Sequence, residues 1–258
     1  MSNYRAVVNS QGQFETKKQT SILSKSLIVG GVAFGITFAF SLLLYFLLNK
    51  YISNENQDIV TSLYVISIIC IIATLVLSLF TLRRIEKIKL ALLIWMIVLY
   101  AIGNGLSFGV LFYAISLSQS SIDMYDIIIC FLLTCGIFAI SGTVGTMLSA
   151  RFTLSLGKFL MIATFAFLIS FLILMFISLF THILGSEKIN ILIWAIWGVM
   201  IILYIMYDLS VISKSQQFIQ MSDSPTQTKY VFMFGFMLFV NLIQLFWVMI
   251  RLMLSLKR

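Results

Sequence analysis

Seven long apolar stretches, separated by short polar segments, dominate the chain. A helix needs about 20 apolar residues to cross the hydrocarbon core of a bilayer, and each stretch is long enough. The stretches are 27–48, 60–82, 90–117, 124–148, 157–180, 190–213 and 230–254. The pattern predicts an all-α membrane protein, a bundle of seven transmembrane helices in which no connecting segment is long enough to fold separately.

The two ends of the chain are polar and predict tails outside this bundle. Residues 1–26 contain Ser, Gln, Lys and Thr, which is typical of a flexible cytoplasmic tail, and residues 255–258 form a short C-terminal tail. The transmembrane domain is thus expected over residues 27–254. The first apolar stretch is longer than a signal-peptide core, and no clear cleavage site follows it, so we expect it to be retained.

Composition and charge agree with a membrane protein and predict its orientation. The chain is 61% hydrophobic and 10% charged, whereas a soluble domain is about a quarter charged. With the N-terminus inside, the cytoplasmic basic residues are Arg5, Lys17, Lys18, Lys25, Arg83, Arg84, Lys87, Lys89, Arg151, Lys158, Lys214 and Lys229. The opposite side holds Lys50, Lys188, Lys257 and Arg258. This positive-inside bias predicts a cytoplasmic N-terminus and an outside C-terminus. The net charge of +8 suits an anionic inner leaflet, and no motif indicates nucleic-acid binding.

Small residues recur at helical spacing in the third and fourth stretches. The sequence GNGLSFG occupies residues 103–109, and SGTVGTMLSA occupies residues 141–150. Small residues four apart let two helix backbones approach closely in a membrane. The motifs therefore predict a tightly packed bundle without indicating a chemistry. The candidate packing residues are Gly105, Gly109, Gly142 and Gly145.

Asp208, in the segment YIMYDLSVI, is the only acidic residue well inside an apolar stretch. A central aspartate costs roughly 2.5–3.5 kcal/mol on insertion scales, so we expect it to face protein or a wet cavity. In the last stretch Asn241, Gln244 and Arg251 fall within an arc of about 80° at 100° per residue. This stripe is either an inward functional face or incidental packing polarity, and Arg251 could instead extend to the interface.

The second stretch ends at a pair of arginines, Arg83 and Arg84. In the predicted topology Asp208 lies toward the same, cytoplasmic end of the bundle. An ion pair between Asp208 and one of these arginines is geometrically feasible. Alternatively, the two arginines only anchor the helix end on the inner side.

Several of these segments resemble the transmembrane Bax inhibitor motif family. The segment LYIMYDLSVI, residues 203–212, resembles the sixth-helix signature of its bacterial members, which carry an LYxLYDLxxI pattern. GNGLSFG, then SGTVG with LSLGKFL at 154–160, and NLIQLF at 241–246 resemble family segments in the same order. The resemblance extends over most of the chain from the second stretch onward.

The resemblance implies a pH-sensitive calcium leak. Two carboxylates on the sixth and seventh helices share a proton, an arginine at the end of the second helix latches onto one, and the seventh helix covers the pore. Asp208 matches the sixth-helix carboxylate, and Arg83 or Arg84 matches the latch. The second carboxylate falls on Asn241, and Thr153 stands where the family often has an acidic residue.

These departures change the expected mechanism. Two close carboxylates titrate as a coupled pair, and with Asn241 in one position we expect weakened pH sensing. Calcium prefers several oxygen ligands, so Asp208 with the carbonyls of Asn241 and Gln244 makes a weak metal site that binds calcium only transiently. We expect a calcium-leak or ion-permeable protein gated around Asp208, with no resident cofactor, in a bacterial inner or plasma membrane.

Two other classes of function compete with an ion leak. The alternative is a regulatory protein without transport that interacts with a membrane protease or a stress factor, which fits a member whose pore chemistry has decayed. An intramembrane hydrolase needs a Ser–His pair, two aspartates or a metal cluster. Asp208 is a single candidate and His182 lies at a stretch end on the opposite face, so no enzyme is expected.

Overall fold

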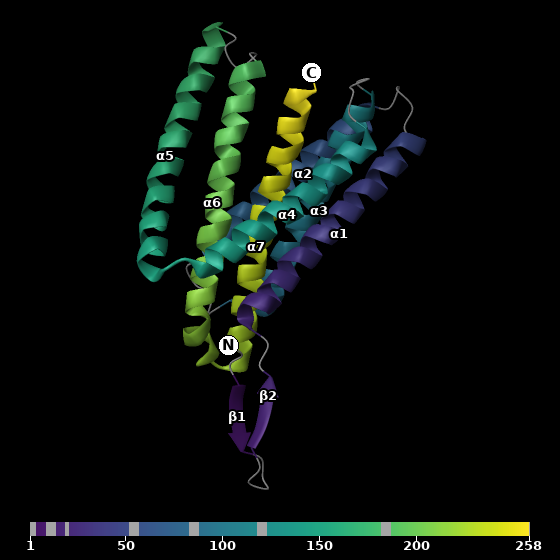
Figure 1. The fold of residues 1–258 in the computed structure, drawn as a ribbon. Helices are drawn as coiled ribbons and strands as arrows, with labels where there is room; N and C mark the ends of the chain where they lie inside the picture. Colours follow the sequence, from purple (N-terminus) through teal and green to yellow (C-terminus); the bar gives the residue numbers. More distant parts are fainter. Residues whose placement is uncertain are drawn as a thin grey trace.

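A hairpin followed by seven helices makes up the part of the chain that the computed structural model describes (Figure 1). The described residues are 4–8, 14–18, 21–51, 57–82, 88–117, 123–181 and 187–257. The strands are β1 (Tyr4–Val8) and β2 (Phe14–Lys18), paired antiparallel. The helices are α1 (Ile22–Tyr51), α2 (Gln57–Leu82), α3 (Leu90–Leu117), α4 (Met124–Met147), α5 (Ala150–Thr181), α6 (Glu187–Gln220) and α7 (Ser224–Leu256).

The helix bounds differ from the predicted stretches mainly at the ends. The bounds of α3 match residues 90–117, but α1 begins at Ile22 rather than residue 27 and α5 at Ala150 rather than residue 157. Helix α6 continues to Gln220, past the predicted end at residue 213. Hydropathy registers only the part of a helix in hydrocarbon, whereas backbone hydrogen bonding continues into the polar interface. The segment expected as a flexible tail contains the hairpin β1–β2.

Six of the helices among the described residues are long and apolar enough to cross a membrane. They are α1, α3, α4, α5, α6 and α7. In α2 the described apolar part, Asp58–Thr74, is shorter than a span. The protein is therefore a multi-pass membrane protein, and the seventh crossing remains a prediction.

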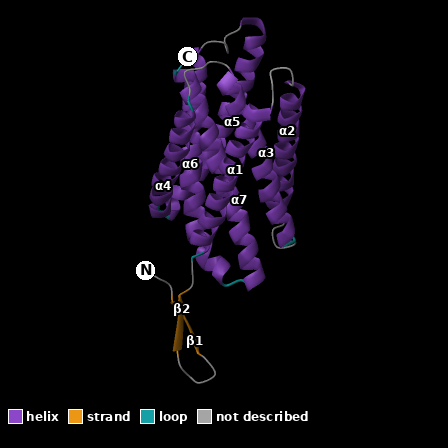
Figure 2. Cartoon of the chain, turned by 90° about the vertical axis from the view of Figure 1, so that its right-hand side faces the viewer, coloured by secondary structure: helices purple, strands orange, loops and turns teal. Residues whose placement is uncertain are grey.

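Helix α7 lies at the centre of the bundle and packs against α1, α3, α4 and α6. Helix α2 packs along α3 and helix α5 along α6, at the two edges of the bundle (Figures 1 and 2). The N-terminal hairpin extends from one end of the bundle, and the C-terminus lies at the other end (Figure 1). This arrangement buries Asn241 of α7 inside the bundle.

An aromatic cluster fixes α7 against α1 and α4. Phe131 of α4 stacks on Phe34 and Phe38 of α1, with ring centroids 5.1 Å and 4.1 Å apart. Phe246 of α7 meets Phe34 and Phe38 edge-on, at 5.9 Å and 5.7 Å. Stacked and edge-to-face pairs at such distances are favourable beyond the area they bury. The cluster thus holds three helices in one relative rotation.

The glycines of the third and fourth stretches lie at close helix contacts. A Cβ atom on Gly105 would lie 2.5 Å from Phe40 Cδ1 of α1. On Gly145 it would lie 2.5 Å from the backbone oxygen of Met206 in α6, and on Gly142 it would lie 2.8 Å from Leu209 Cδ1. A Cβ atom on Gly109 would lie 2.7 Å from Leu44 Cδ2 of α1. The backbones of α4 and α6 therefore approach so closely that glycine alone fits at position 145 without a shift.

Candidate functional site around Asp208

Asp208 of α6 and Asn241 of α7 are joined by a buried hydrogen bond. The Asn241 amide nitrogen donates to Asp208 Oδ2 over 2.7 Å. The two residues are 9% and 8% exposed, respectively. The structure therefore brings Asp208 together with the residue at which the resemblance implies a second carboxylate. A carboxylate buried in this way needs such a donor, because an unmet buried charge is costly.

An apolar seam between α6 and α7 surrounds this hydrogen bond. Ile205, Leu209 and Ile212 of α6 are at most 1% exposed, and they pack with Leu238 and Leu245 of α7. Within α6 and α7, Asp208 and Asn241 occupy positions at helical spacing from these residues, so both point into the seam. The hydrogen bond is thus a polar contact within a largely apolar interface.

The polar stripe of α7 is buried at one end and exposed at the other. Asn241 is buried, Gln244 is half-buried and takes no part in the hydrogen bond to Asp208, and Arg251 is exposed. The Arg251 guanidinium lies 5.8 Å from the ring centroids of both Trp194 and Trp247. Asn241 therefore faces the protein interior, whereas Arg251 makes cation–π contacts near the C-terminal end of α7.

Two elements of the sequence hypothesis cannot be placed around Asp208. Arg83 and Arg84, the candidate latch, lie outside the described residues. No group of three or more His, Cys, Asp or Glu side chains that could hold a metal occurs within the described ranges. Within the described residues, Asp208 offers one carboxylate, to which the Asn241 carbonyl would add one more oxygen. This is a sparse ligand set for a calcium ion.

A second polar cluster, at Lys214, was not found from the sequence. The Lys214 ammonium donates to Ser149 O over 3.0 Å, to Ser210 Oγ over 2.7 Å and to the Thr153 hydroxyl. Thr153 and Ser210 are buried, and their hydroxyls are 2.7 Å apart. Lys214 and Ser210 are four apart on α6, the spacing at which helix side chains meet. This spacing of Ser210 and Lys214 is the one feature of the sequence that could indicate the cluster. Asp208 is easier to recognise, because it is an acidic residue in apolar surroundings.

The Lys214 cluster fastens α6 to the break between α4 and α5. Leu148 after α4 has extended backbone angles, and Ser149 Oγ accepts a hydrogen bond from the Phe152 amide at the start of α5. Lys214 binds the carbonyl of the same Ser149. The cluster and the Asp208–Asn241 pair are six residues apart on α6, about 9 Å along its axis. Helix α6 therefore carries two polar attachments, one to α7 and one to the α4–α5 break.

Polar residues of α3 serve packing rather than this site. Ser107 Oγ of α3 lies 2.8 Å from Ser67 Oγ of α2 within the bundle. Asn104 donates to the Tyr100 carbonyl of its own helix over 2.8 Å. The Ser67–Ser107 bond joins two helices, and such bonds between transmembrane helices are worth about 0.6 kcal/mol on average.

These features define a multi-pass helical membrane protein with a buried carboxylate–amide pair between its last two helices. The chain belongs to the family described as inhibitor of apoptosis-promoting Bax1, whose match covers residues 22–258. This membership confirms the resemblance found in the YIMYDLSVI segment. No curated protein sequence matches the chain.

Proposed function

We propose that this protein is an ion-permeable membrane protein of the Bax-inhibitor type, a calcium leak gated around Asp208 with weak pH sensing. The observation that carries the proposal is the buried hydrogen bond from Asn241 to Asp208. It joins the helix that bears the family's sixth-helix signature to the central helix α7. A gate needs a structural element with a closed and an open arrangement. In this proposal the contact between α6 and α7 is that element.

The hydrogen bond favours the closed arrangement. If α7 moved away from α6, the Asp208 carboxylate would lose its donor inside an apolar seam. Leaving a buried partner unsatisfied costs about 1–3 kcal/mol, and more for a charged group. Opening would therefore require water or a cation to reach Asp208, which couples permeation to separation of the two helices.

Asn241 explains why pH sensing is weak in this proposal. A pair of carboxylates at this distance would share a proton and respond to pH as a coupled unit. An amide does not titrate, so no such shared proton exists between Asp208 and Asn241. The ion selectivity is correspondingly low, because one carboxylate with the Asn241 and Gln244 carbonyls binds calcium weakly, and a weak site still releases its ion.

The proposed topology has seven crossings, with the N-terminus in the cytoplasm and the C-terminus outside. The two ends of the chain lie at opposite ends of the bundle (Figure 2), as an odd number of crossings requires. The bias of basic residues toward the N-terminal side supports this sidedness, and the short connecting segments in the sequence favour a bacterial plasma membrane. In this topology Arg83 or Arg84 remains the proposed latch for Asp208.

Calcium flux in proteoliposomes tests the proposal directly. Purified wild-type protein is reconstituted with a calcium dye inside the vesicles and compared with Asp208→Asn and Asn241→Asp at equal protein content. Wild-type flux above that of empty vesicles, changed by Asp208→Asn, supports a leak at Asp208. Absence of flux above the empty-vesicle rate in all three proteins would overturn it.

A regulatory protein without transport is the second candidate. The observation that favours it is Asn241 itself, because replacing a carboxylate by an amide removes the charge that attracts a cation to this position. In this case the partner would be another membrane protein, such as a protease or a stress factor. Stable co-purification of one such protein with a chain that passes no calcium supports this candidate. In neither case do we propose an enzymatic activity or a resident cofactor.

A further inference from the structure

A polar cavity lies where the ends of three helices meet, near the N-terminal hairpin. It is formed by the start of α1, the end of α6 and the start of α7, and has a volume of about 290 Å³. This volume is at the lower end of the range for small-molecule sites, roughly 300–1,000 Å³. Because three long apolar helices begin or end here, we expect the cavity to lie near a surface of the membrane.

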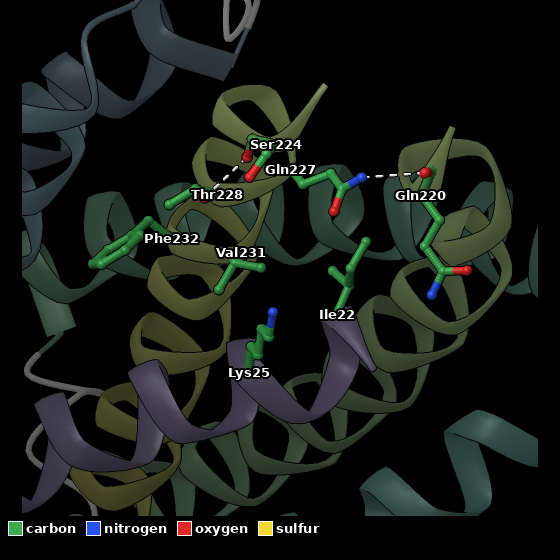
Figure 3. A pocket seen from close by; sticks show the side chains of 8 residues that line it. All are labelled: Ile22, Lys25, Gln220, Ser224, Gln227, Thr228, Val231 and Phe232. Carbon is green, nitrogen blue, oxygen red and sulfur yellow. Dashed lines mark hydrogen bonds between the residues drawn. The ribbon is translucent and has the colours of Figure 1, made fainter. Parts of the chain in front are cut away.

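The cavity has one positive charge. Lys25 of α1 is the only charged residue among the described residues that line it, and its ammonium is directed into the cavity (Figure 3). Asp223, which caps the N-terminus of α7, is exposed and does not line the cavity. Hydrogen bonds from Thr226 keep the pKa of the Asp223 carboxyl below its ordinary value, so this carboxylate is bound by its own helix. Lys25 is therefore available to an anionic group.

Opposite Lys25 the cavity presents hydrogen-bond acceptors. The Gln227 amide nitrogen donates to two backbone oxygens, Gln220 O over 3.1 Å and Ser222 O over 2.8 Å. Both of its hydrogens are thus used, and its amide oxygen is directed into the cavity (Figure 3). The Thr228 hydroxyl gives its hydrogen to Ser224 O over 3.0 Å, which leaves only lone pairs for a ligand.

The remaining wall is apolar and is contributed by the helix bodies. Ile22 and Val231 are buried, and Phe232 is half-buried. The cavity therefore offers a cation, the two acceptors of Gln227 and Thr228, the neutral side chains of Gln220 and Ser224, and an apolar side. A ligand that satisfies all of these carries an anionic group and a hydrogen-bond donor next to an apolar portion.

We propose that the cavity binds a phosphoethanolamine group, with its phosphate on Lys25 and its ammonium on the Gln227 and Thr228 oxygens. A phospholipid headgroup supplies this chemistry with its acyl chains along Ile22, Val231 and Phe232, and a water-soluble phosphoethanolamine ester supplies the same polar groups. A phosphocholine group fits less well, because its ammonium has no hydrogen to donate. The site is independent of Asp208 and does not require transport.

Lipid binding to purified protein tests the site. Wild-type protein is placed in phosphatidylcholine nanodiscs that contain a few per cent of a fluorescent lipid, either phosphatidylethanolamine or the matched phosphatidylcholine. Binding of the fluorescent lipid is measured by energy transfer from the protein's tryptophans. A parallel arm titrates water-soluble glycerophosphoethanolamine against detergent-solubilised protein by thermal shift. Binding of phosphoethanolamine in either arm, at least several-fold better than the choline analogue, is the expected result.

Variants assign this binding to the cavity. Lys25→Gln should weaken phosphoethanolamine binding about tenfold, because it removes a charge-assisted hydrogen bond. The matched control is Lys229→Gln, which removes a charge from the same end of α7 outside the cavity and should leave binding unchanged. Thr228→Val should reduce the preference over choline. Equal binding by wild type and Lys25→Gln, or no preference over choline in the wild type, overturns the proposal even if a variant folds poorly.

Discussion

The Asn241 amide nitrogen lies 2.7 Å from Asp208 Oδ2 and is the polar contact that crosses the apolar seam between α6 and α7. This hydrogen bond joins an ionisable carboxyl group to an amide that cannot titrate. At the position where the resemblance implies a pair of carboxylates, this contact therefore has one titratable group instead of two. Several consequences of this exchange can be measured.

Asn241→Asp should introduce pH-dependent flux. The substitution places two carboxylates at hydrogen-bond distance, and such a pair shares a proton with one raised apparent pKa. In proteoliposomes we expect the calcium flux of the variant to change several-fold between about pH 6 and 8, whereas the wild type changes little. Gln244→Asp is the matched control, because it adds the same charge three residues away, outside the hydrogen bond. Equal pH profiles for both variants would count against a special role for position 241.

Removing one partner of the pair should destabilise the protein more than removing both. Asn241→Leu leaves the Asp208 carboxylate buried without its donor, which costs about 1–3 kcal/mol. The double variant Asp208→Leu with Asn241→Leu extends the apolar seam and should recover most of this loss. Unfolding of detergent-solubilised protein, followed by tryptophan fluorescence, gives the four free energies of the cycle. Additive losses would show that the two side chains do not interact energetically.

Much of the bundle could be predicted from the sequence, because hydropathy records the bilayer directly. The interior of α3 and the inward position of Asp208 followed from apolar length and from the cost of a charge in lipid. The helix ends could not be predicted in this way, since α5 begins at Ala150, seven residues before the predicted apolar stretch, in a segment that Arg151 interrupts.

The site was only partly accessible to the same reasoning. Asn241 was found because its position in α7 aligned with a family carboxylate, but Lys214 was not. Its partners Thr153 and Ser149 lie more than 60 residues away, and only the fold brings them to α6. The hairpin β1–β2 was missed for a simpler reason, since its five-residue strands carry no apolar alternation that would separate them from a polar tail.

Gly145→Ala should weaken the bundle, and the same substitution at Gly136 should not. A Cβ at position 145 would lie 2.5 Å from Met206 O and 2.9 Å from its Cα, so the backbones of α4 and α6 must separate. Overpacking of this kind typically costs about 1–3 kcal/mol. Gly136, on the same helix, has nothing within 4 Å of that atom, and alanine there should be neutral or slightly stabilising. Thermal unfolding of the two variants compares them, and equal losses would contradict a close approach at Gly145.

Lys214→Met should loosen the attachment of the α4–α5 break to α6. The variant keeps the length of the side chain but loses the donors to Ser149 O, Ser210 Oγ and Thr153. Because Lys214 is exposed, solvent screening limits the loss of stability to about 1 kcal/mol. Because Ser149 also caps the first turn of α5, backbone protection near Ser149 should fall more than the overall stability. We therefore expect faster hydrogen exchange for residues 149–153.

A control variant and a rescue variant distinguish the hydrogen bonds of Lys214 from the loss of one positive charge. Lys158→Met removes an exposed lysine of α5 on the same helix as Thr153, and should leave exchange at residues 149–153 unchanged. Lys214→Arg keeps a donor and should restore most of the protection, although its planar group fits three oxygens less well than an ammonium. If exchange in Lys214→Met equalled that of the wild type, the two attachments of α6 would reduce to one, and movement of α6 would depend on the Asp208–Asn241 contact alone.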